Sequence, residues 1–389
     1  MRILVLCERV DDEGGTESYL RATLPALAAA GDDVRVVARS ASRPDAYGVE
    51  AVAVPWSDEH DEPSAAAAQT VASIARDFAP DVVAAHNVLD AGVLRAAEAP
   101  RQIYHLHDHR PFCPNGDRLY PQGGSICNVP MGAFSCGFHS LIHGCAYGPR
   151  RQTLALVGIR RRVASLVCEA DATVVFSAYM GAVACRNGVR IERVATIAPP
   201  LEDSAYAAVL APRPDTDSVL FAGRVMPSKG ARSLVRAVAR IDESMRPRVT
   251  IAGEGPDLVA TIEEARASNV AFDALGRLDA DGLRDAYDRT TIVAMPSTWG
   301  EPFGLVGIEA FARGRPVVAY DSGGIEQWLV RGTGILVPRG DEEGLARAIL
   351  EMLDAQRWRD ASERAFEAAS AYGLAAHVAR LRAIYSGVA

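Results

Sequence analysis

The chain has 389 residues, of which 49% are hydrophobic, and a formal net charge of −8 at pH 7. This length exceeds what one hydrophobic core usually serves, so we expect two domains, and the acidic balance argues against a nucleic-acid partner. No stretch approaches the length of a membrane span, and Glu8 brings a charge too early for a secretory signal, so we expect a cytoplasmic protein.

Short β-branched runs alternate with helix-length, alanine-rich segments along most of the chain. This alternation is typical of α/β proteins with doubly wound parallel sheets, which bind ligands at the carboxyl ends of their strands. The expected strands are residues 2–7, 34–38, 81–85, 172–176, 219–222, 249–252, 292–295 and 316–319.

Prolines suggest where one domain ends and the next begins. They cluster between residues 199 and 214, where the hydrophobic periodicity lapses. We therefore expect an N-terminal domain at 1–198, a linker at 199–214 and a second domain at 215–373, with a substrate cleft between two Rossmann-like domains. A last helix is expected over about 374–386, within the terminal segment 374–389.

A histidine and an aspartate follow another strand-like run, residues 103–106. His107 and Asp108 stand at the tip of that strand, where a functional pair is as plausible as a structural one. His105 lies two residues earlier on the same face, and we expect it to be a satisfied interior histidine. The role of His109 stays open.

Four of the seven cysteines fall in one stretch with two histidines between them. Proline and glycine are frequent there, so residues 110–148 are expected to form a long irregular loop, a kind that usually has a function or a cross-link. Structural Zn²⁺ is our first interpretation, disulfides the second and an iron–sulfur centre the third. No Cys-x-x-Cys occurs, and four unlinked thiols remain an alternative. The cysteines are Cys113, Cys127, Cys136 and Cys145.

Five arginines lie between residues 149 and 163, on an expected amphipathic helix. We interpret them first as a solvated helix face. Weak contact with an anionic membrane surface is the alternative, since basic amphipathic helices bind such surfaces.

The chain contains a single lysine among 41 basic residues. Lys229 follows the expected strand 219–222 in a glycine-containing turn that also carries Arg224. Lysine is a compact, rotatable charge that can follow phosphate oxygens, whereas arginine presents a rigid fork. The turn therefore predicts a phosphate cradle, and chance survival of one lysine is the alternative.

Two glutamates flank the start of an expected helix. Glu301 and Glu309 should lie about 12 Å apart along it, with the free N–H groups of Phe303, Gly304 and Leu305 between them. Carboxylates accept hydrogen bonds from hydroxyls, and a helix N-terminus attracts phosphate. The arrangement suits a nucleotide sugar, and an ordinary acidic helix start is the alternative.

These motifs, in this order, resemble the retaining GT-B glycosyltransferases of family 4 over nearly the whole chain. The resemblance implies a GT-B fold and a last helix that crosses back onto the N-terminal domain. The matching segments are Gly14-Gly15-Thr16-Glu17, His107-Asp108, Gly223-Arg224, Lys229-Gly230, Gly253-Glu254-Gly255-Pro256 and Glu301 to Glu309.

The resemblance also implies partners and roles. The donor would be a UDP- or GDP-linked sugar, and the acceptor a hydroxyl of a small molecule, lipid or glycan. The catalytic residues would be His107, Arg224, Lys229 and Glu301. The donor-binding residues would be Gly14, Gly15, Arg224, Lys229, Gly253, Glu254, Phe303, Gly304, Leu305 and Glu309, with Glu17 and Asp108 on the acceptor side.

The resemblance implies that sugar transfer proceeds without a protein nucleophile. Departure of the diphosphate builds negative charge, which Arg224, Lys229 and helix N–H groups would stabilise, so no cofactor is expected for catalysis. The Asp-x-Asp at 279–281 is interpreted as a helix N-cap. The rival functions are a GT-B sugar-nucleotide epimerase and a catalytically silent glycan-binding module. The sequence does not indicate an oligomeric state.

Overall fold

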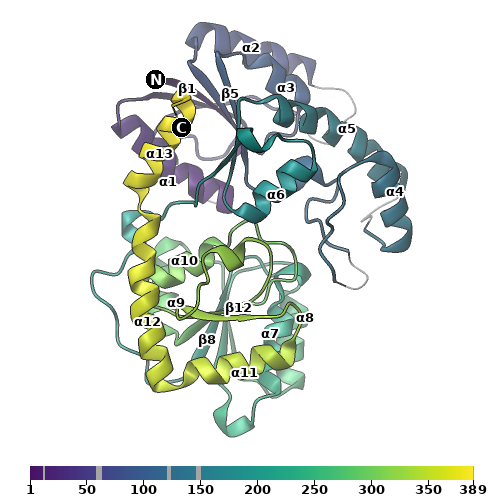
Figure 1. The fold of residues 1–389 in the computed structure, drawn as a ribbon. Coiled ribbons are helices and arrows are strands. Elements are labelled where there is room, and N and C mark those ends of the chain that lie inside the picture. Colours follow the sequence, from purple (N-terminus) through teal and green to yellow (C-terminus); the bar gives the residue numbers. More distant parts are fainter. Residues whose placement is uncertain (12–13, 58–63, 121–123, 146–149, 389) are drawn as a thin grey trace. The chain divides into compact units, whose positions relative to one another are not determined.

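The computed structural model describes residues 1–11, 14–57, 64–120, 124–145 and 150–388 (Figure 1). Contacts within the chain group it into two compact units. Unit 1 comprises Met1–Pro200 with Leu374–Ala389, and unit 2 comprises Leu201–Gly373. Each unit is built on one parallel sheet, so the expected class, α/β with two doubly wound Rossmann-like sheets, is confirmed.

Unit 1 contains a seven-stranded sheet in the order β3-β2-β1-β4-β5-β6-β7, with every neighbouring pair parallel. The strand order reverses between β1 and β4, and α/β sheets bind ligands at such a switch point. The strands are β1 (Arg2–Val10), β2 (Asp33–Ala41), β3 (Glu50–Ala53), β4 (Val82–His86), β5 (Arg101–Leu106), β6 (Ala172–Val175) and β7 (Val194–Thr196).

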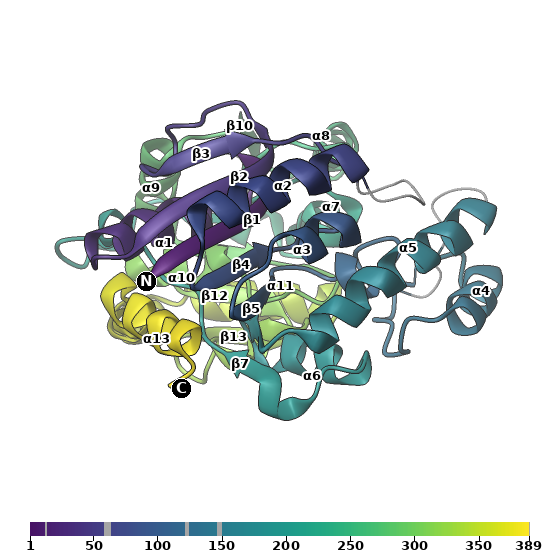
Figure 2. The same cartoon turned by 90° about the horizontal axis from the view of Figure 1, so that it is seen from above.

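Helices pack against this sheet on both faces because successive strand side chains point in opposite directions. On one face Leu4 and Leu6 of β1 join a core with α2, α3 and α5, which Figure 2 shows one after another. Elsewhere in unit 1 α1 packs against α13 (Figures 1 and 2). The helices are α1 (Gly15–Ala29), α2 (Ala65–Phe78), α3 (Ala91–Ala96), α4 (Ala133–Ile142), α5 (Arg150–Glu169), α6 (Ala178–Arg186) and α13 (Leu374–Ser386).

Buried polar contacts tie α13 into unit 1. His377 of α13 shares a 3.0 Å hydrogen bond with the Tyr19 hydroxyl of α1, and its other ring nitrogen lies 2.8 Å from the carbonyl of Ala198. Tyr385 reaches His105 of β5 at 2.9 Å. The last helix is therefore part of the unit formed by the first 200 residues.

Unit 2 contains a six-stranded parallel sheet in the order β10-β9-β8-β11-β12-β13, which reverses between β8 and β11. The strands are β8 (Ser218–Ala222), β9 (Arg248–Ala252), β10 (Phe272–Gly276), β11 (Ile292–Met295), β12 (Val317–Tyr320) and β13 (Gly334–Val337). The helices are α7 (Ala231–Ala239), α8 (Leu258–Ala267), α9 (Ala280–Arg289), α10 (Leu305–Ala312), α11 (Glu342–Leu353) and α12 (Ala355–Ala369).

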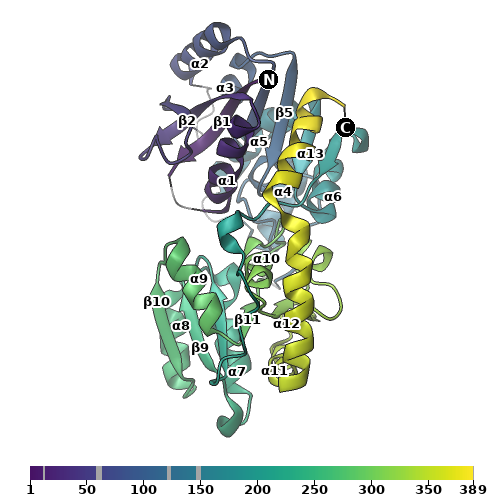
Figure 3. The ribbon, with the colours of Figure 1, turned by 90° about the vertical axis from the view of Figure 1, so that its left-hand side faces the viewer.

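In unit 2 the helices pack in neighbouring pairs around the sheet. α7 contacts α8 and α11, while α10 packs on α12 (Figure 3). Leu234, Val235 and Val238 of α7 are fully buried in the core formed with β8 and β9. Residues 201–214 fold with this unit, where the N–H of Leu201 donates to the carbonyl of Tyr372 at 2.8 Å.

The eight expected strands are all present, and their ends lie within three residues of the expected ones. β3, β7, β10 and β13 were not predicted, because none of them is a continuous β-branched run. No described helix is long and apolar enough to cross a membrane.

Two expectations about the middle of unit 1 are wrong in part. Residues 133–142, placed in an irregular loop, form α4, because this stretch lacks proline and can pack on α5. Small Gly137 makes that approach close, since a Cβ there would lie 3.5 Å from Leu154. On α5 the side chain of Arg160 is buried, so the five arginines do not share one solvated face.

Candidate functional site

Lys229 and Glu301 meet at the switch point of the unit 2 sheet. Lys229 follows β8 and Glu301 follows β11, and these are the two strands between which the order reverses. The ammonium of Lys229 donates to Oε1 of Glu301 at 2.7 Å. It also lies 4.8 Å from the centre of the Trp299 ring, a cation–π distance.

The carboxylate of Glu301 is buried but ionised. Its residue is only 4% exposed, and burial alone would raise its pKa. The Lys229 ammonium and hydrogen bonds from Ser297, at 2.6 Å, and Trp299 outweigh burial and lower the pKa overall. An ammonium has three N–H donors, so Lys229 keeps donors for a further acceptor.

The N-terminus of α10 begins beside Glu301. Gly304 is the N-cap with φ +97°, in the left-handed region, and no side chain caps the helix. The N–H of Gly307 donates to the carbonyl of Gly304 at 3.0 Å, and the N–H groups before it, at the start of the helix, form a site for an anion. The side chain of Phe303 is buried, and the backbone carbonyl of Phe303 accepts a hydrogen bond from the Trp328 indole at 2.6 Å. Phe303 therefore positions this turn.

Glu309 lies on α10 with a phenol beside it. The hydroxyl of Tyr287 on α9 donates to Oε2 of Glu309 at 2.9 Å. Glu309 is partly exposed. Both glutamates of the motif are thus oriented by hydrogen-bond donors of unit 2.

Glycine turns after β8 and β9 bring two more sequence motifs together. The N–H of Val225 donates to the carbonyl of Glu254 at 2.8 Å, so the turns run side by side. Gly253 has φ +154°, and a Cβ there would lie 1.9 Å from the carbonyl oxygen of Gly223. Arg224 and Glu254 are both exposed at this edge.

Adding a methyl group at Gly253 should destabilise the two turns that follow β8 and β9. Gly253→Ala should lower the free energy of unfolding by roughly 2 kcal/mol or more, because both its dihedral and the nearby carbonyl exclude a Cβ. Gly158→Ala is the matched control: exposed Gly158 on α5 has nothing near its would-be Cβ, so this change should stabilise by about 0.5–1 kcal/mol. Urea unfolding measures both, and equal stability of the two variants would contradict the assignment.

In unit 1, Gly14 and Glu17 lie together at the start of α1. Gly14 is the N-cap with φ +112°, and Gly15 is the first helical residue. A Cβ at Gly14 would lie 2.5 Å from a carboxylate oxygen of Glu17. Burial raises the pKa of Glu17, while its ion pair with Arg9, at 3.2 Å, opposes that rise.

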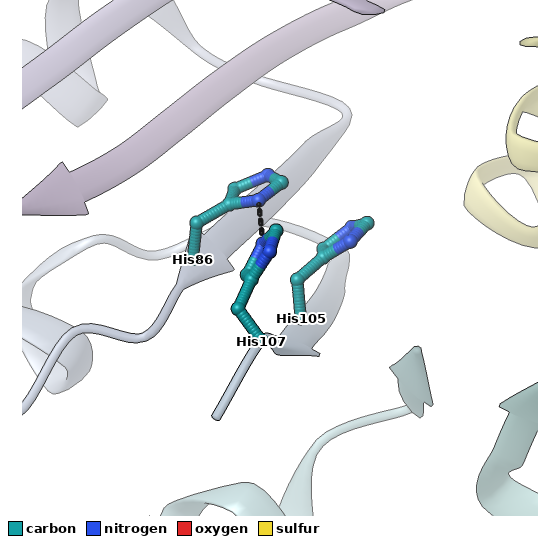
Figure 4. A group of neighbouring side chains, drawn as sticks. All are labelled: His86, His105 and His107. Carbon is teal, nitrogen blue, oxygen red and sulfur yellow. Dashed lines mark hydrogen bonds between the residues drawn. The ribbon is translucent and has the colours of Figure 1, made fainter. Parts of the chain in front are cut away.

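Three histidines converge at the carboxyl ends of β4 and β5 (Figure 4). His86 ends β4 and stacks on His105 of β5, with ring centres 4.0 Å apart. His86 Nδ1 lies 2.9 Å from His107 Nε2, the hydrogen bond drawn in Figure 4. The backbone N–H of His107 donates a hydrogen bond to the side-chain oxygen of Asn87 at 2.9 Å.

The ring protons of this cluster can be assigned from the hydrogen bonds. Burial, reinforced by neighbouring positive charge, lowers the pKa of His86, His105 and His107 well below the usual value, so all three are neutral. His86 Nε2 is buried and has no partner among the described residues. Because an unpaired buried N–H is rarer than an unpaired acceptor, we infer that His86 donates from Nδ1. His107 then carries its own proton on Nδ1, as a donor.

The same three rings offer nitrogens within 4.8 Å of one another, as a metal site would. The His86 and His107 nitrogens already share a hydrogen bond, and Nε2 of His105 lies 2.9 Å from the Tyr385 hydroxyl. The cluster is therefore better described as a neutral hydrogen-bonded network than as a cation site.

Unit 1 should lose stability in mild acid because of this network. Unfolded histidines take up protons as the pH falls below about 6.5, whereas the three buried rings stay neutral, so the unfolded state binds more protons. Each ring should cost up to about 1.4 kcal/mol of stability per pH unit below that value. Unfolding free energies measured from pH 8 to 5 should show this slope. His105→Phe should reduce this slope by the contribution of one proton, about 1.4 kcal/mol per pH unit. An unchanged slope would contradict the assignment of neutral rings.

The neighbours of His107 have structural partners. Asp108 accepts from the backbone N–H and the guanidinium of Arg110 at 2.8 and 2.7 Å. His109 is fully buried against Tyr179. His105 is also fully buried, which confirms its interior position, but only Nε2 is hydrogen-bonded, and Nδ1 has no partner among the described residues.

The four clustered cysteines line one pocket of unit 1, together with His139 and Arg118. All seven cysteines are free thiols. The Asp-x-Asp is a helix cap as expected, because Asp279 accepts from the N–H of Gly282 at 2.8 Å at the start of α9. Asp281 pairs with Arg284.

Several residues of these sites were missed from the sequence. His86 and Asn87 follow a predicted strand, so the rule that found His107 applies to them equally. Ser297 and Trp299 lie in the loop that leads to Glu301, but nothing in their spacing marks them as its donors. Tyr287 lies on α9 after the Asp-x-Asp, and no motif includes it.

Family models match most of the chain in two parts. The model described as "Glycosyltransferase Family 4" matches residues 13–204, and "Glycosyl transferases group 1" matches residues 216–355. A D-inositol 3-phosphate glycosyltransferase of Streptosporangium roseum is 34% identical over 188 residues, which are 44% of this chain and 43% of that protein. The chain thus matches less than half the length of that relative. Glycogen synthase of Mycobacterium tuberculosis is 28% identical over 88% of this chain and 83% of its own.

Solved structures share the fold along their whole length. The Anabaena protein HepE in complex with UDP superposes with a TM-score of 0.73 at 20% identity, over 100% of both chains. Sucrose-phosphate synthase of Thermosynechococcus elongatus gives a TM-score of 0.73 at 20% identity, over 100% of this chain and 99% of that one. With these folds and both family models in agreement, the chain belongs to the GT-B glycosyltransferases of family 4.

Proposed function

We propose that the chain transfers a sugar from a UDP- or GDP-linked donor to a hydroxyl acceptor, with retention at the anomeric carbon. The observation that carries the proposal is the 2.7 Å contact between Lys229 and Glu301 at the switch point of unit 2. It places a cation and an ionised carboxylate at the point where α/β sheets bind nucleotides. The diphosphate of a nucleotide sugar can bind the cation, and the hydroxyls of its sugar can donate hydrogen bonds to the carboxylate.

The diphosphate of the donor would bind to the positively charged groups of unit 2. Lys229 keeps free N–H donors, Arg224 is exposed on the adjacent turn, and Gly304 and Leu305 begin α10 with uncapped N–H groups. As the bond to the sugar breaks, negative charge grows on the leaving phosphate, and fixed donors of this kind stabilise it. We propose that these groups serve in place of a divalent ion, since the Asp-x-Asp of the chain is used as a helix cap.

The two glutamates would hold the two ends of the donor. Glu301 accepts hydrogen bonds from the hydroxyls of the sugar, and Glu309 accepts from those of the ribose, with Tyr287 fixing its orientation. Gly253 and Glu254 would neighbour the nucleoside. Because Gly253 brings the two turns into contact, a side chain there would also narrow the space for the base.

From unit 1 we propose a hydrogen-bond donor and an acceptor-binding surface. His107 would donate from Nδ1 to a hydroxyl of the sugar being transferred, with its ring held by His86. Gly14 and Gly15 would let the backbone approach the donor closely, as glycine permits. Glu17 and Asp108 would face the acceptor.

Among the acceptor classes, a lipid has one structural feature in its favour. The α4 helix exposes large apolar side chains, Phe134 at 88%, and it packs on α5, which carries exposed Arg151 and Arg161. Sedimentation with anionic phospholipid vesicles, and with neutral ones as control, tests this contact. Phe134→Ser with Phe138→Ser should reduce binding to the anionic vesicles several-fold. Equal sedimentation of both proteins would remove the argument for lipid.

The proposed reaction is tested by product analysis. Purified protein is incubated in EDTA with UDP- and GDP-sugars, with and without a panel of hydroxyl acceptors, and the products are followed by proton NMR. The expected result is release of nucleoside diphosphate that depends on an acceptor, with the anomeric configuration of the donor retained in the product. Formation of a C2-epimerised sugar without acceptor would establish the epimerase instead. Absence of any turnover across the panel would favour a silent binding module.

A further inference from the structure

Four cysteines that the proposed transfer does not use come together from four separate segments of unit 1. Cys113 follows a 3-10 turn (Arg110–Phe112), Cys127 lies next to an isolated bridge between Leu119 and Ile126, and Cys136 lies on α4. Cys145 follows that helix, and all four line one pocket. We propose that these four thiols bind one structural Zn²⁺ as thiolates in a tetrahedral site.

The turn around Cys113 already presents hydrogen-bond donors to its sulfur. Backbone N–H groups of Arg118, Asn115 and Gly116 are hydrogen-bond donors toward this thiol. Gly116 closes the turn with φ +86°, which favours glycine. Donors aimed at sulfur stabilise a thiolate ligand and orient it, whereas a disulfide sulfur carries no charge for them to stabilise. The turn therefore favours a metal over a disulfide at Cys113.

The guanidinium of a buried arginine beside the pocket donates to backbone carbonyl oxygens. Arg118 is 2% exposed, and its guanidinium donates to the carbonyl oxygens of Phe112, Cys127 and Val129. Within the described ranges no carboxylate pairs with it. A buried cation without an anion is costly. Four thiolates around Zn²⁺ carry a net charge of −2, so the proposed site would place negative charge beside the Arg118 guanidinium.

The other three thiols line the same pocket. Thiolates gathered there without a cation would repel one another, because like charges in one pocket are unfavourable. A divalent cation among them removes that repulsion and favours deprotonation. On binding, four S–H bonds break, four Zn–S bonds form, and four protons pass to solvent.

The thiols must move to bind one ion. Among the described residues, no three donor atoms of this cluster lie within 4.8 Å of one another, whereas Zn–S bonds are about 2.3 Å long. Rotation about χ1 moves a cysteine sulfur without moving the backbone, and it supplies part of this approach. The ion would thereby link the segment after His107 to α4 and stabilise the connection between β5 and α5.

The metal content of the purified full-length protein tests the proposal. Plasma mass spectrometry should find about one zinc per chain, and replacing Cys113, Cys127, Cys136 or Cys145 with serine should lower it about tenfold. Cys168→Ser and Cys185→Ser are matched controls, since both residues lie in unit 1 outside the pocket, and they should keep the zinc. Cobalt substituted for zinc in the unaltered protein should show the visible spectrum of a tetrahedral thiolate site.

The cobalt spectrum keeps the proposal testable if a serine variant fails to fold. Mass spectrometry of the denatured, alkylated protein distinguishes the remaining outcomes. A metal-free protein with all thiols alkylated, or with a disulfide among the four, would overturn the site. Sugar transfer need not be measured, so failure here leaves the proposed function untouched.

Discussion

Lys229→Met should lower kcat about 10²- to 10³-fold, because it removes a fixed positive charge from the place where the leaving diphosphate gains negative charge. Methionine has a similar length and replaces the cation–π contact with Trp299 by an apolar one. The folded protein should still form, since the ion pair lies beyond the carboxyl ends of β8 and β11 and outside the hydrophobic core of unit 2. Steady-state rates of nucleoside diphosphate release, with folding checked by thermal unfolding, measure the effect.

The matched control for this variant is Arg240→Met. Arg240 is the exposed C-cap residue of α7 and pairs only with Glu342 among the residues described, so the substitution removes one positive charge from unit 2 outside the candidate site. Its rate should stay within twofold of the unaltered protein. Equal loss in both variants would show that net charge, and not the position of Lys229, is responsible.

Glu301→Ala should also reduce transfer by about 10²-fold or more, because the sugar hydroxyls lose their acceptor and Lys229 loses the partner that positions it. The substitution should destabilise unit 2 as well, by roughly 1–3 kcal/mol, since the partly buried ammonium is left unpaired. Kinetics and urea unfolding of the same preparation measure the two effects separately.

A double variant separates the structural role of this pair from the catalytic one. Lys229→Met combined with Glu301→Gln removes both charges, so stability should recover relative to Lys229→Met alone, which strands an ionised carboxylate that is 4% exposed. Activity should not recover. Recovery of both would mean that the ion pair is only structural.

The pH dependence of the Glu301 contribution follows from its lowered pKa. A carboxylate held ionised below its unfolded pKa stabilises the folded state above about pH 4.5, and that stability is lost as the pH falls through the folded value. The histidine network of unit 1 acts in a different window, below about pH 6.5. The two units should therefore respond to acid in separate pH ranges.

The sequence was most informative about charged residues that follow the expected strands. The single lysine and the paired glutamates are enough to predict that Lys229, Glu301 and the start of α10 follow strands and face a ligand. The contact between Lys229 and Glu301 could not be predicted, because it depends on strand order: β8 and β11 are neighbours only because the sheet reverses between them. That pairing is decided by packing of the whole unit.

The histidine network shows a limit of prediction from sequence motifs. His107 was singled out, but its partner His86 was not, although each stands at the end of a parallel strand in the same sheet. The register of β4 on β5, which sets His86 opposite His105, makes them a cluster, and periodicity within one strand does not reveal register between two. The α4 helix was missed for a local reason, because flanking prolines and glycines masked ten residues able to pack on α5.

The most direct test of the donor site is a calorimetric titration of the full chain with UDP-glucose and with GDP-mannose, in EDTA, beside the same titrations of Lys229→Met. One of the two nucleotide sugars should bind saturably at one site, and the variant should bind it at least about tenfold more weakly, a loss of about 1.4 kcal/mol. Binding of equal strength to both proteins, or no binding of either nucleotide sugar to the unaltered chain, would contradict a donor site at Lys229 and Glu301.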